Sequence, residues 1–185
     1  MTKLIRWLII ISSAMILTGV IIIAVKYYEI KQREFLLRYL TPIATDSLLN
    51  WSKYYGFERN WLKIFSLLMT ESEGQRKRIS PKQCKGYMQL QDRTAQILRD
   101  RLREKISRTG PFDTEFNIAG GILFLRDIYD SAGMRDWILT IEQYNTGIYN
   151  YQIKGKRAPN HVKRYSISET YYKWEWKKYL MPGMD

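Results

Sequence analysis

The chain of 185 residues has room for one globular domain and a short appendage, and its 45% apolar content excludes a wholly disordered protein. The 30 Lys and Arg against 18 Asp and Glu give a net charge of +12, which fits nucleic acid, an anionic membrane surface or an acidic polymer as partner, or only a solvated surface. One Cys and one His exclude an internal disulfide and argue against a metal site or a Ser–His–Asp triad, so carboxylates are the expected catalytic groups.

An uncharged apolar stretch, WLIIISSAMILTGVIIIAV, occupies residues 7–25. A helix needs about 20 such residues to cross a membrane, whereas the apolar part of a secretory signal usually has about 7–15. The stretch runs directly into Lys26-Tyr27-Tyr28, where no cleavage site is visible. We therefore expect residues 1–6 to be a short tail, 7–25 a retained transmembrane anchor, 26–41 a stalk that continues the helix, and 42–185 the main domain.

The basic residues beside the anchor bear on its orientation. Two of them precede it and four follow it within the stalk: Lys3 and Arg6, then Lys26, Lys31, Arg33 and Arg38. Because basic residues gather on the cytoplasmic side of a membrane span, this count favours a cytoplasmic C-terminal domain.

Helical patterning dominates the rest of the chain, and no strand-like alternation longer than a few residues is present, so the main domain is expected to be mostly α. Pro42 fits a first helical position, Gly56 a helix stop and Asn60 an N-cap, while the basic residues 75–89 are broken by Pro81 and predict a loop. The expected helices run from Pro42 towards Gly56, Trp61 to about Glu73, Asp92 or Thr94 to about Arg103, Asp113 or Thr114 to Asp130, about Met134 to Tyr144, and Tyr171 to Tyr179.

The C-terminal region carries a further helix-start signal. Ser166-x-x-Glu169 has the spacing of a capping box and predicts that the last helix begins near Tyr171. His161 then falls in a polar loop, and we expect it to be exposed. The aromatic residues of the last helix are expected to pack in the core or an interface.

Four segments carry a family pattern when they are taken together in chain order. They are GFERNWL (56–62) with MTES (69–72), SPKQCKGYMQL (80–90) with Thr94-Ala95, NIAGGILFL (117–125), and QYNTG (143–147). Over about residues 43–180 they resemble the lytic transglycosylases of the soluble-lytic-transglycosylase (SLT) and goose-lysozyme-like family. The resemblance implies a mostly α, lysozyme-like lytic transglycosylase domain preceded by a single transmembrane helix. Gln83, Cys84 and Tyr87 depart from the pattern and leave the shape of the glycan groove open.

By this resemblance, Glu71 is the catalytic acid and base. It first protonates the linkage oxygen after N-acetylmuramic acid (MurNAc), and as a carboxylate it then takes the proton of that sugar's C6 hydroxyl, which attacks C1. No metal or cofactor is needed. Glu71 follows Leu68 and Met69 at a helix C-terminus, where an apolar setting and the helix dipole both raise a carboxyl pKa. Glu73 points to another face of the helix and is expected at the surface.

The resemblance also implies residues that support Glu71. Tyr144 is expected to point its hydroxyl at or near Glu71 and to orient it. Ser72 and Gln89 are expected to hydrogen-bond the substrate or the Glu71 region. Asn145 is expected to bind sugar or to lock its loop.

Gly86 and Met88 are expected to form the wall of the groove, with plain core packing as the alternative for Met88. For Asn117 we expect a packing or capping role. A cluster of basic residues beside the proposed groove fits attraction of peptide carboxylates or a solvated surface equally well: Arg76, Lys77, Arg78, Lys82 and Lys85.

The predicted function is a peptidoglycan lytic transglycosylase that cleaves the MurNAc–GlcNAc β-1,4 linkage, forms 1,6-anhydroMurNAc and opens the wall locally. One alternative is a muramidase on the same fold, and another is a non-catalytic, basic, membrane-anchored wall-binding protein. The expected partners are glycan strands, the membrane and a secretion, conjugation or virion assembly, without nucleic acid. The activity requires the domain on the wall side (periplasmic or extracytoplasmic) or in a virion membrane, opposite to the basic-residue count.

Overall fold

The computed structural model describes residues 3–131 and 135–181, and the chain divides into two compact units, one ending at Arg38 and the other beginning at Tyr39. The first unit is a single helix, α1 (Lys3–Leu36), which continues through the charged residues after the apolar stretch and ends at Leu36, short of residue 41 where we expected the stalk to end. The segment Ile10–Leu36 is long and apolar enough to cross a membrane, a test that a signal sequence near the N-terminus also passes.

The second unit is built from helices, and the expectation of a mostly α domain is confirmed. Within the two described ranges no β-strand is present, and β pairing is limited to isolated bridges of Lys85 with Ile79 and Leu90. The elements of this unit are α2 (Pro42–Tyr54), the 3-10 helix η1 (Glu58–Asn60), α3 (Trp61–Ser72), α4 (Asp92–Leu102), α5 (Thr114–Ser131), α6 (Trp137–Thr146), α7 (Ile148–Gln152) and α8 (Pro159–Leu180).

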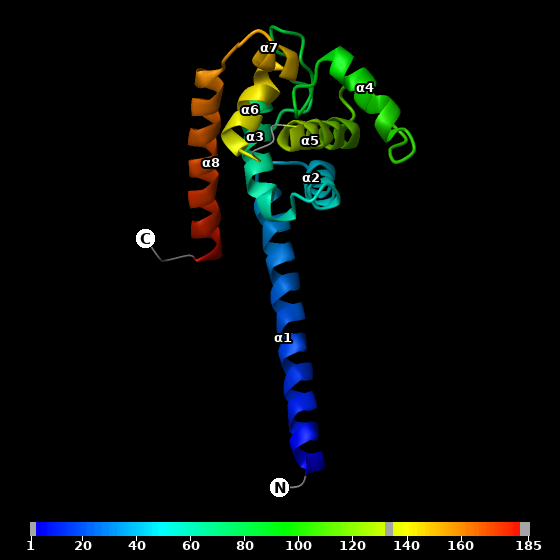
Figure 1. Cartoon of the computed structure of the whole chain (residues 1–185), viewed down its shortest axis with the longest axis vertical. Helices are drawn as coiled ribbons and strands as arrows, with labels where there is room; N and C mark the ends of the chain where they lie inside the picture. Colours follow the sequence, from blue (N-terminus) through cyan, green and yellow to red (C-terminus); the bar gives the residue numbers. More distant parts are fainter. Residues whose placement is uncertain (1–2, 132–134, 182–185) are drawn as a thin grey trace. The chain divides into compact units, whose positions relative to one another are not determined.

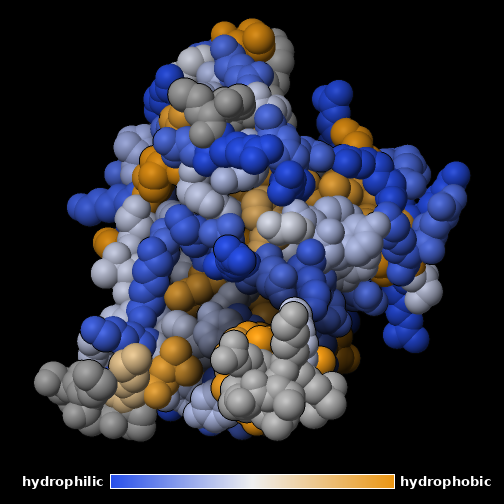
Figure 2. Space-filling view, turned by 60° about the horizontal axis from the view of Figure 1, so that its bottom comes forward, coloured by the Kyte–Doolittle hydropathy of each residue, from blue (hydrophilic) through white to orange (hydrophobic). Residues whose placement is uncertain are grey.

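Two helices organise the core of the second unit (Figure 1). Helix α3 packs against α8 and α2, and α5 packs against α2, α4 and α6. Their inward side chains, such as Phe65, Leu68, Phe116 and Ile122, are fully buried, and each contributes about 1.5–3 kcal/mol of hydrophobic stabilisation. Hydrophilic side chains cover most of the face seen in Figure 2, with hydrophobic residues confined to scattered patches.

Several helix boundaries follow from the capping residues that the sequence indicates. The Thr41 hydroxyl accepts a hydrogen bond from the Ala44 N–H at 3.3 Å, directly before Pro42 at the first helical position of α2. The Asp113 carboxylate accepts from the Phe116 N–H at 3.0 Å and starts α5 in the same way.

Two capping predictions are wrong. Asn60 makes no side-chain cap for α3, because the chain enters this helix through η1 and Asn60, at φ −110° and ψ 12°, lacks the extended conformation of a side-chain N-cap. Ser166 and Glu169 form no capping box, because α8 already begins at Pro159 and both residues lie inside it. Glu169 pairs there with Lys173 and Lys63.

The predicted start of the sixth helix at about Met134 lies outside the described residues. The described helix α6 begins at Trp137, and the reason is local: the Asp136 carboxylate accepts hydrogen bonds from the Ile138 and Leu139 N–H groups at 2.7 and 3.1 Å. Asp136 is therefore the N-cap of this helix.

Candidate active site

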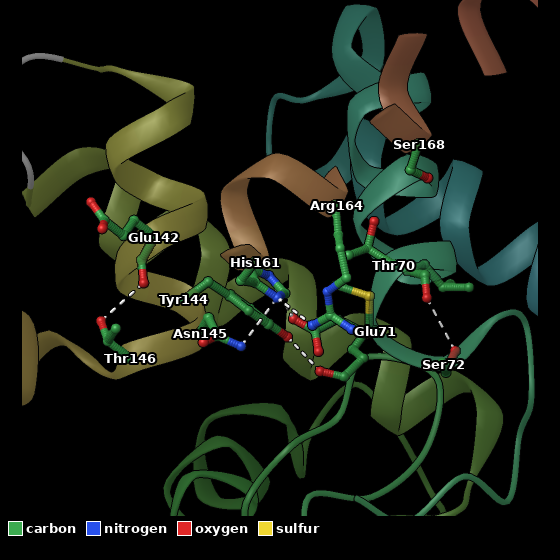
Figure 3. A network of polar contacts seen from close by, with 12 residues as sticks. Thr70, Glu71, Ser72, Glu142, Tyr144, Asn145, Thr146, His161, Arg164 and Ser168 are labelled. Atoms are coloured by element: carbon green, nitrogen blue, oxygen red, sulfur yellow. Dashed lines mark hydrogen bonds and ion pairs between the residues drawn. The ribbon is translucent and has the colours of Figure 1, made fainter. Parts of the chain in front are cut away.

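A cavity of about 770 Å³ opens in the second unit where three chain segments meet. Most of its lining comes from the C-terminal end of α3, the loop of residues 73–91 that follows α3 (hereafter the α3–α4 loop), and the region from α6 to the start of α8. Thr94 of α4 and Phe124 of α5 complete it. Glu71, Tyr144, Asn145, His161 and Arg164 converge on this cavity from helices that are far apart in sequence (Figure 3).

Glu71 lies in the last turn of α3, in the helix position that the sequence predicts. Its side chain is only 11% exposed, and its Oε1 atom is shielded from solvent. Burial raises the pKa of Glu71 to about 8, although the positive charges of Arg164 and Lys82 act in the opposite direction. The carboxyl group therefore holds its proton at neutral pH and can serve as an acid.

His161 faces Glu71, and the expectation of an exposed loop residue is wrong. It lies in the first turn of α8 and is buried, with its Nε2 atom 3.3 Å from Oε1 of Glu71. Burial, followed by the charges of Arg164 and Lys82, lowers the pKa of His161 to about 4, so the imidazole is neutral at neutral pH. The signal that could have placed it is Pro159, which fits the first position of a helix as well as a loop.

Tyr144 is buried beside the cavity and packs against Phe124, with 5.4 Å between the ring centroids. Burial first, and then the nearby Glu71 charge, raise the pKa of Tyr144 well above its usual value, so the phenol stays protonated. Its hydroxyl donates to the main-chain carbonyl of Met88 at 2.8 Å. The structure thus places Tyr144 next to Glu71 but commits its hydroxyl to the α3–α4 loop.

The α3–α4 loop is held by Asn117 of α5. The Asn117 amide oxygen accepts from the Met88 N–H at 2.7 Å, and its Nδ2 donates to the carbonyls of Lys85 and Pro111 at 2.9 and 3.0 Å. Gly86 sits against this amide at a φ of 79°, and a Cβ there would lie 2.3 Å from Asn117 Nδ2. The close approach requires glycine at this position.

Gly86 and Met88 therefore contact Asn117 through their backbone and help to hold the loop, and both lie outside the cavity lining. Met88 is fully buried, which favours the core-packing alternative. Gln89 does line the cavity, but its side-chain amide donates to the carbonyls of Gly86 and Arg78 at 2.7 and 3.2 Å. These contacts of the amide nitrogen hold the loop together.

Ser72 and Asn145 differ in their position relative to the cavity: Asn145 lines it and Ser72 does not. Ser72 is buried, lies outside the cavity lining, and donates its hydroxyl to the Leu68 carbonyl at 3.1 Å. Asn145 lines the cavity, and its Nδ2 atom lies 3.2 Å from Nδ1 of His161.

Positive charge dominates the lining of the cavity. Of the basic cluster that the sequence indicates, Arg78 and Lys82 line it, whereas Lys85 pairs with Asp92 and Arg76 donates to the Phe112 carbonyl. Sequence reasoning missed two further basic residues that line it, Arg157 and Arg164. Among the residues that the structure describes, no group of three or more His, Cys, Asp or Glu side chains could hold a metal ion.

A helical domain with a buried carboxyl group that keeps its proton at neutral pH, beside an open cavity, resembles the lysozyme-like class of proteins in its general acid. Residues 49–167, well over half of the chain, match the Transglycosylase SLT domain family, and the chain belongs to this family. The family supports a lytic-transglycosylase-type action on peptidoglycan in general. No curated protein and no solved structure matches the chain.

Proposed function

We propose that the protein is a peptidoglycan lytic transglycosylase that cleaves the MurNAc–GlcNAc β-1,4 linkage and leaves a 1,6-anhydroMurNAc end. One observation carries the proposal. Glu71 is a buried carboxyl group with a pKa of about 8, and it borders a cavity in a chain that belongs to the SLT family.

The first step needs an acid that keeps its proton at neutral pH. Glu71 gives its proton to the linkage oxygen while the bond from that oxygen to C1 of MurNAc breaks, and the sugar develops oxocarbenium character. In the second step the Glu71 carboxylate takes the proton of the C6 hydroxyl, whose oxygen bonds to C1. Because this nucleophile belongs to the same sugar, its proximity lowers the barrier without a second molecule.

The carboxylates around the cavity favour this internal nucleophile. Glu73 is the other acidic side chain in the lining, and it is exposed and lies 3.7 Å from Arg78 in an ion pair. A retaining hydrolase that uses a carboxylate nucleophile needs a second carboxyl group about 5 Å from the acid on the far side of the sugar. Glu73 follows Glu71 by two positions at the end of α3 and does not face it across the cavity as that mechanism requires.

The basic lining fits the substrate class. Peptidoglycan strands carry peptide stems with free carboxylates, and the guanidinium and ammonium groups of Arg78, Lys82, Arg157 and Arg164 border the cavity. Arginine pairs readily with carboxylates in a bidentate geometry. We propose that these groups attract the stems while Glu71 acts on the sugar chain.

The test is digestion of purified sacculi with the full-length protein in detergent, followed by mass spectrometry of the soluble muropeptides. We expect products with 1,6-anhydro ends from the wild type, a loss of about a thousandfold in Glu71→Gln, and retained release in the control Glu73→Gln. Products with reducing ends would replace the proposal by a muramidase. Binding to sacculi without any release, in wild type and Glu71→Gln alike, would replace it by a wall-binding protein.

We also propose that α1 anchors the protein in a membrane with the second unit on the wall side, because peptidoglycan lies there. The basic residues around the apolar stretch predict the opposite side, so the two arguments conflict. A C-terminal alkaline phosphatase fusion separates them, since this reporter is active only outside the cytoplasm. An inactive but stable fusion would overturn the proposed orientation.

A further inference from the structure

The hydrogen-bond partners of His161 determine where its ring proton resides. Nδ1 lies 3.2 Å from Nδ2 of Asn145 and 3.3 Å from Nη2 of Arg164. A guanidinium group has donors only, so Nδ1 must be the acceptor, whichever way the Asn145 amide is turned. A neutral imidazole carries one N–H, which therefore lies on Nε2.

The Nε2–H group faces Glu71. The distance from Nε2 to Oε1 is 3.3 Å, and both atoms are shielded from solvent. Neither atom makes a hydrogen bond of regular geometry within residues 3–131 and 135–181. Buried polar atoms are almost always paired in folded proteins, and exceptions gather at functional sites. At 3.3 Å, these two unsatisfied atoms are close enough for a hydrogen bond to each other.

We propose that His161 is a positioning residue for Glu71, an inference that rests on the proposed transglycosylase function. Its Nε2–H donates to Oε1, so the acid proton of Glu71 is confined to Oε2, the oxygen that can deliver it to the linkage. After that transfer, the same N–H stabilises the carboxylate until the C6 hydroxyl returns a proton. His161 keeps its own proton throughout.

The charged groups around the pair keep His161 neutral while it does this. Arg164 of the same helix and Lys82 of the α3–α4 loop both lower its pKa, and burial acts in the same direction. Tyr144 faces the pair from α6 as a protonated phenol. The other titratable groups that line the cavity are Glu73, Arg78, Cys84 and Arg157.

The first experiment reads the tautomer directly. The chain has one histidine, so the ¹⁵N spectrum of the full-length protein in detergent shows a single imidazole. We expect the Nε2–H tautomer at pH 7, and we expect its signals to shift as Glu71 ionises near pH 8 but to stay constant over that range in Glu71→Gln. A proton on Nδ1, a charged ring at pH 7, or the same pH course in both proteins would overturn the proposal.

The second experiment compares two amides at position 161. The side-chain nitrogen of Gln reaches the place of imidazole Nε2, whereas that of Asn reaches only the place of Nδ1. We expect His161→Asn to slow muropeptide release about 10- to 100-fold, since a hydrogen bond to a charged group is lost, and His161→Gln to recover most of the rate. Since the lost donor favours the ionised carboxyl, the alkaline limb of the rate profile moves to higher pH in His161→Asn.

These outcomes separate the two proposals. If the wild-type protein releases no muropeptides, the proposed function is contradicted. The ¹⁵N spectrum still decides whether Nε2–H faces Glu71. A purely structural role for His161 would lower the rate of both amide variants equally and leave the alkaline limb in place. That result would overturn the positioning role and leave the transglycosylase function intact.

Discussion

Two regions border the cavity, and they treat their polar atoms in opposite ways. Around the α3–α4 loop, the polar side chains make hydrogen bonds within the protein. The amide of Gln89, and the Asn117 amide and Tyr144 hydroxyl of neighbouring helices, all bond to main-chain atoms of the loop. In the Glu71–His161 pair, the two facing atoms are buried without a regular hydrogen bond in the part of the chain that the structure describes. The loop contacts therefore stabilise the fold, whereas the pair leaves Glu71 Oε1 and His161 Nε2 unsatisfied among the described residues, as the proposed role of Glu71 in proton transfer requires.

Replacing Glu71 by Gln should have the largest effect of all, and it should change activity and stability in opposite directions. Release of muropeptides should fall about a thousandfold, while the protein should gain stability at alkaline pH. Burial raises the folded-state pKa of Glu71 from 4.5 to about 8, so its stabilising contribution is complete below pH 4.5 and is lost as the pH rises through 8. Gln avoids this loss.

Thermal unfolding of wild type and Glu71→Gln between pH 5 and pH 9 measures the effect. We expect the melting temperature of the variant, relative to wild type, to rise over this range. The exposed Glu73 provides the control, and Glu73→Gln should show no such trend. A constant difference between wild type and Glu71→Gln would mean that Glu71 is ionised in the folded protein at neutral pH.

Replacing Asn117 by Ala tests the loop side of the comparison. The change removes two hydrogen bonds to the α3–α4 loop and a third to the Pro111 carbonyl, and the Met88 N–H is left buried without a partner. We expect a loss of about 2–4 kcal/mol in the free energy of unfolding, measured by urea denaturation. Asn145→Ala, at the cavity surface, should cost less than about 1 kcal/mol. Equal costs would remove the distinction between the two regions.

The pH dependence of the rate should show whether Glu71 acts as the acid. Above pH 8 the fraction of Glu71 that carries a proton falls about tenfold per pH unit, and the initial rate should fall with it. Lys82 is one of the charges that lower the pKa of Glu71, so Lys82→Gln should move this alkaline limb to higher pH. A wild-type rate that stays flat to pH 10 would contradict Glu71 as the acid.

The smallest expected effect concerns the Tyr144 hydroxyl. Tyr144→Phe removes its hydrogen bond to the Met88 carbonyl and should cost about 1 kcal/mol of unfolding free energy. We expect the rate to fall by less than about tenfold, in line with a structural role in the loop. A drop comparable to that of Glu71→Gln would show instead that the hydroxyl acts on the reacting groups.

Local sequence signals predicted the mostly α fold, the start of α2 at Pro42 and the position of Glu71 in the last turn of α3. They work because a cap or a helix end depends on a few neighbouring residues. Ser72 could not be judged in the same way, because a serine in a helix either faces a ligand or bonds the carbonyl four residues back, and here it bonds Leu68.

The pairing of Glu71 with His161 depends on how α3 packs against α8, and no local pattern carries that information. Two sequence signals indicated different starts for the last helix: the capping-box spacing of Ser166 and Glu169, and Pro159. The helix begins at Pro159. As a result, His161 lies buried in the first turn of α8 and not in the loop that the sequence predicted. The error in one helix boundary therefore removed a central residue from the predicted site.

The burial of the Glu71 side chain, which is only 11% exposed, bears on how the protein handles protons over a full turnover. In the proposed reaction the proton given to the leaving sugar is replaced by the proton of the C6 hydroxyl, so the cycle neither takes up nor releases one. A site of this kind needs no exchange with bulk water between turnovers and gains nothing from buffer molecules. Its rate at fixed pH should accordingly be independent of buffer concentration, a property that would suit the proposed activity inside dense peptidoglycan.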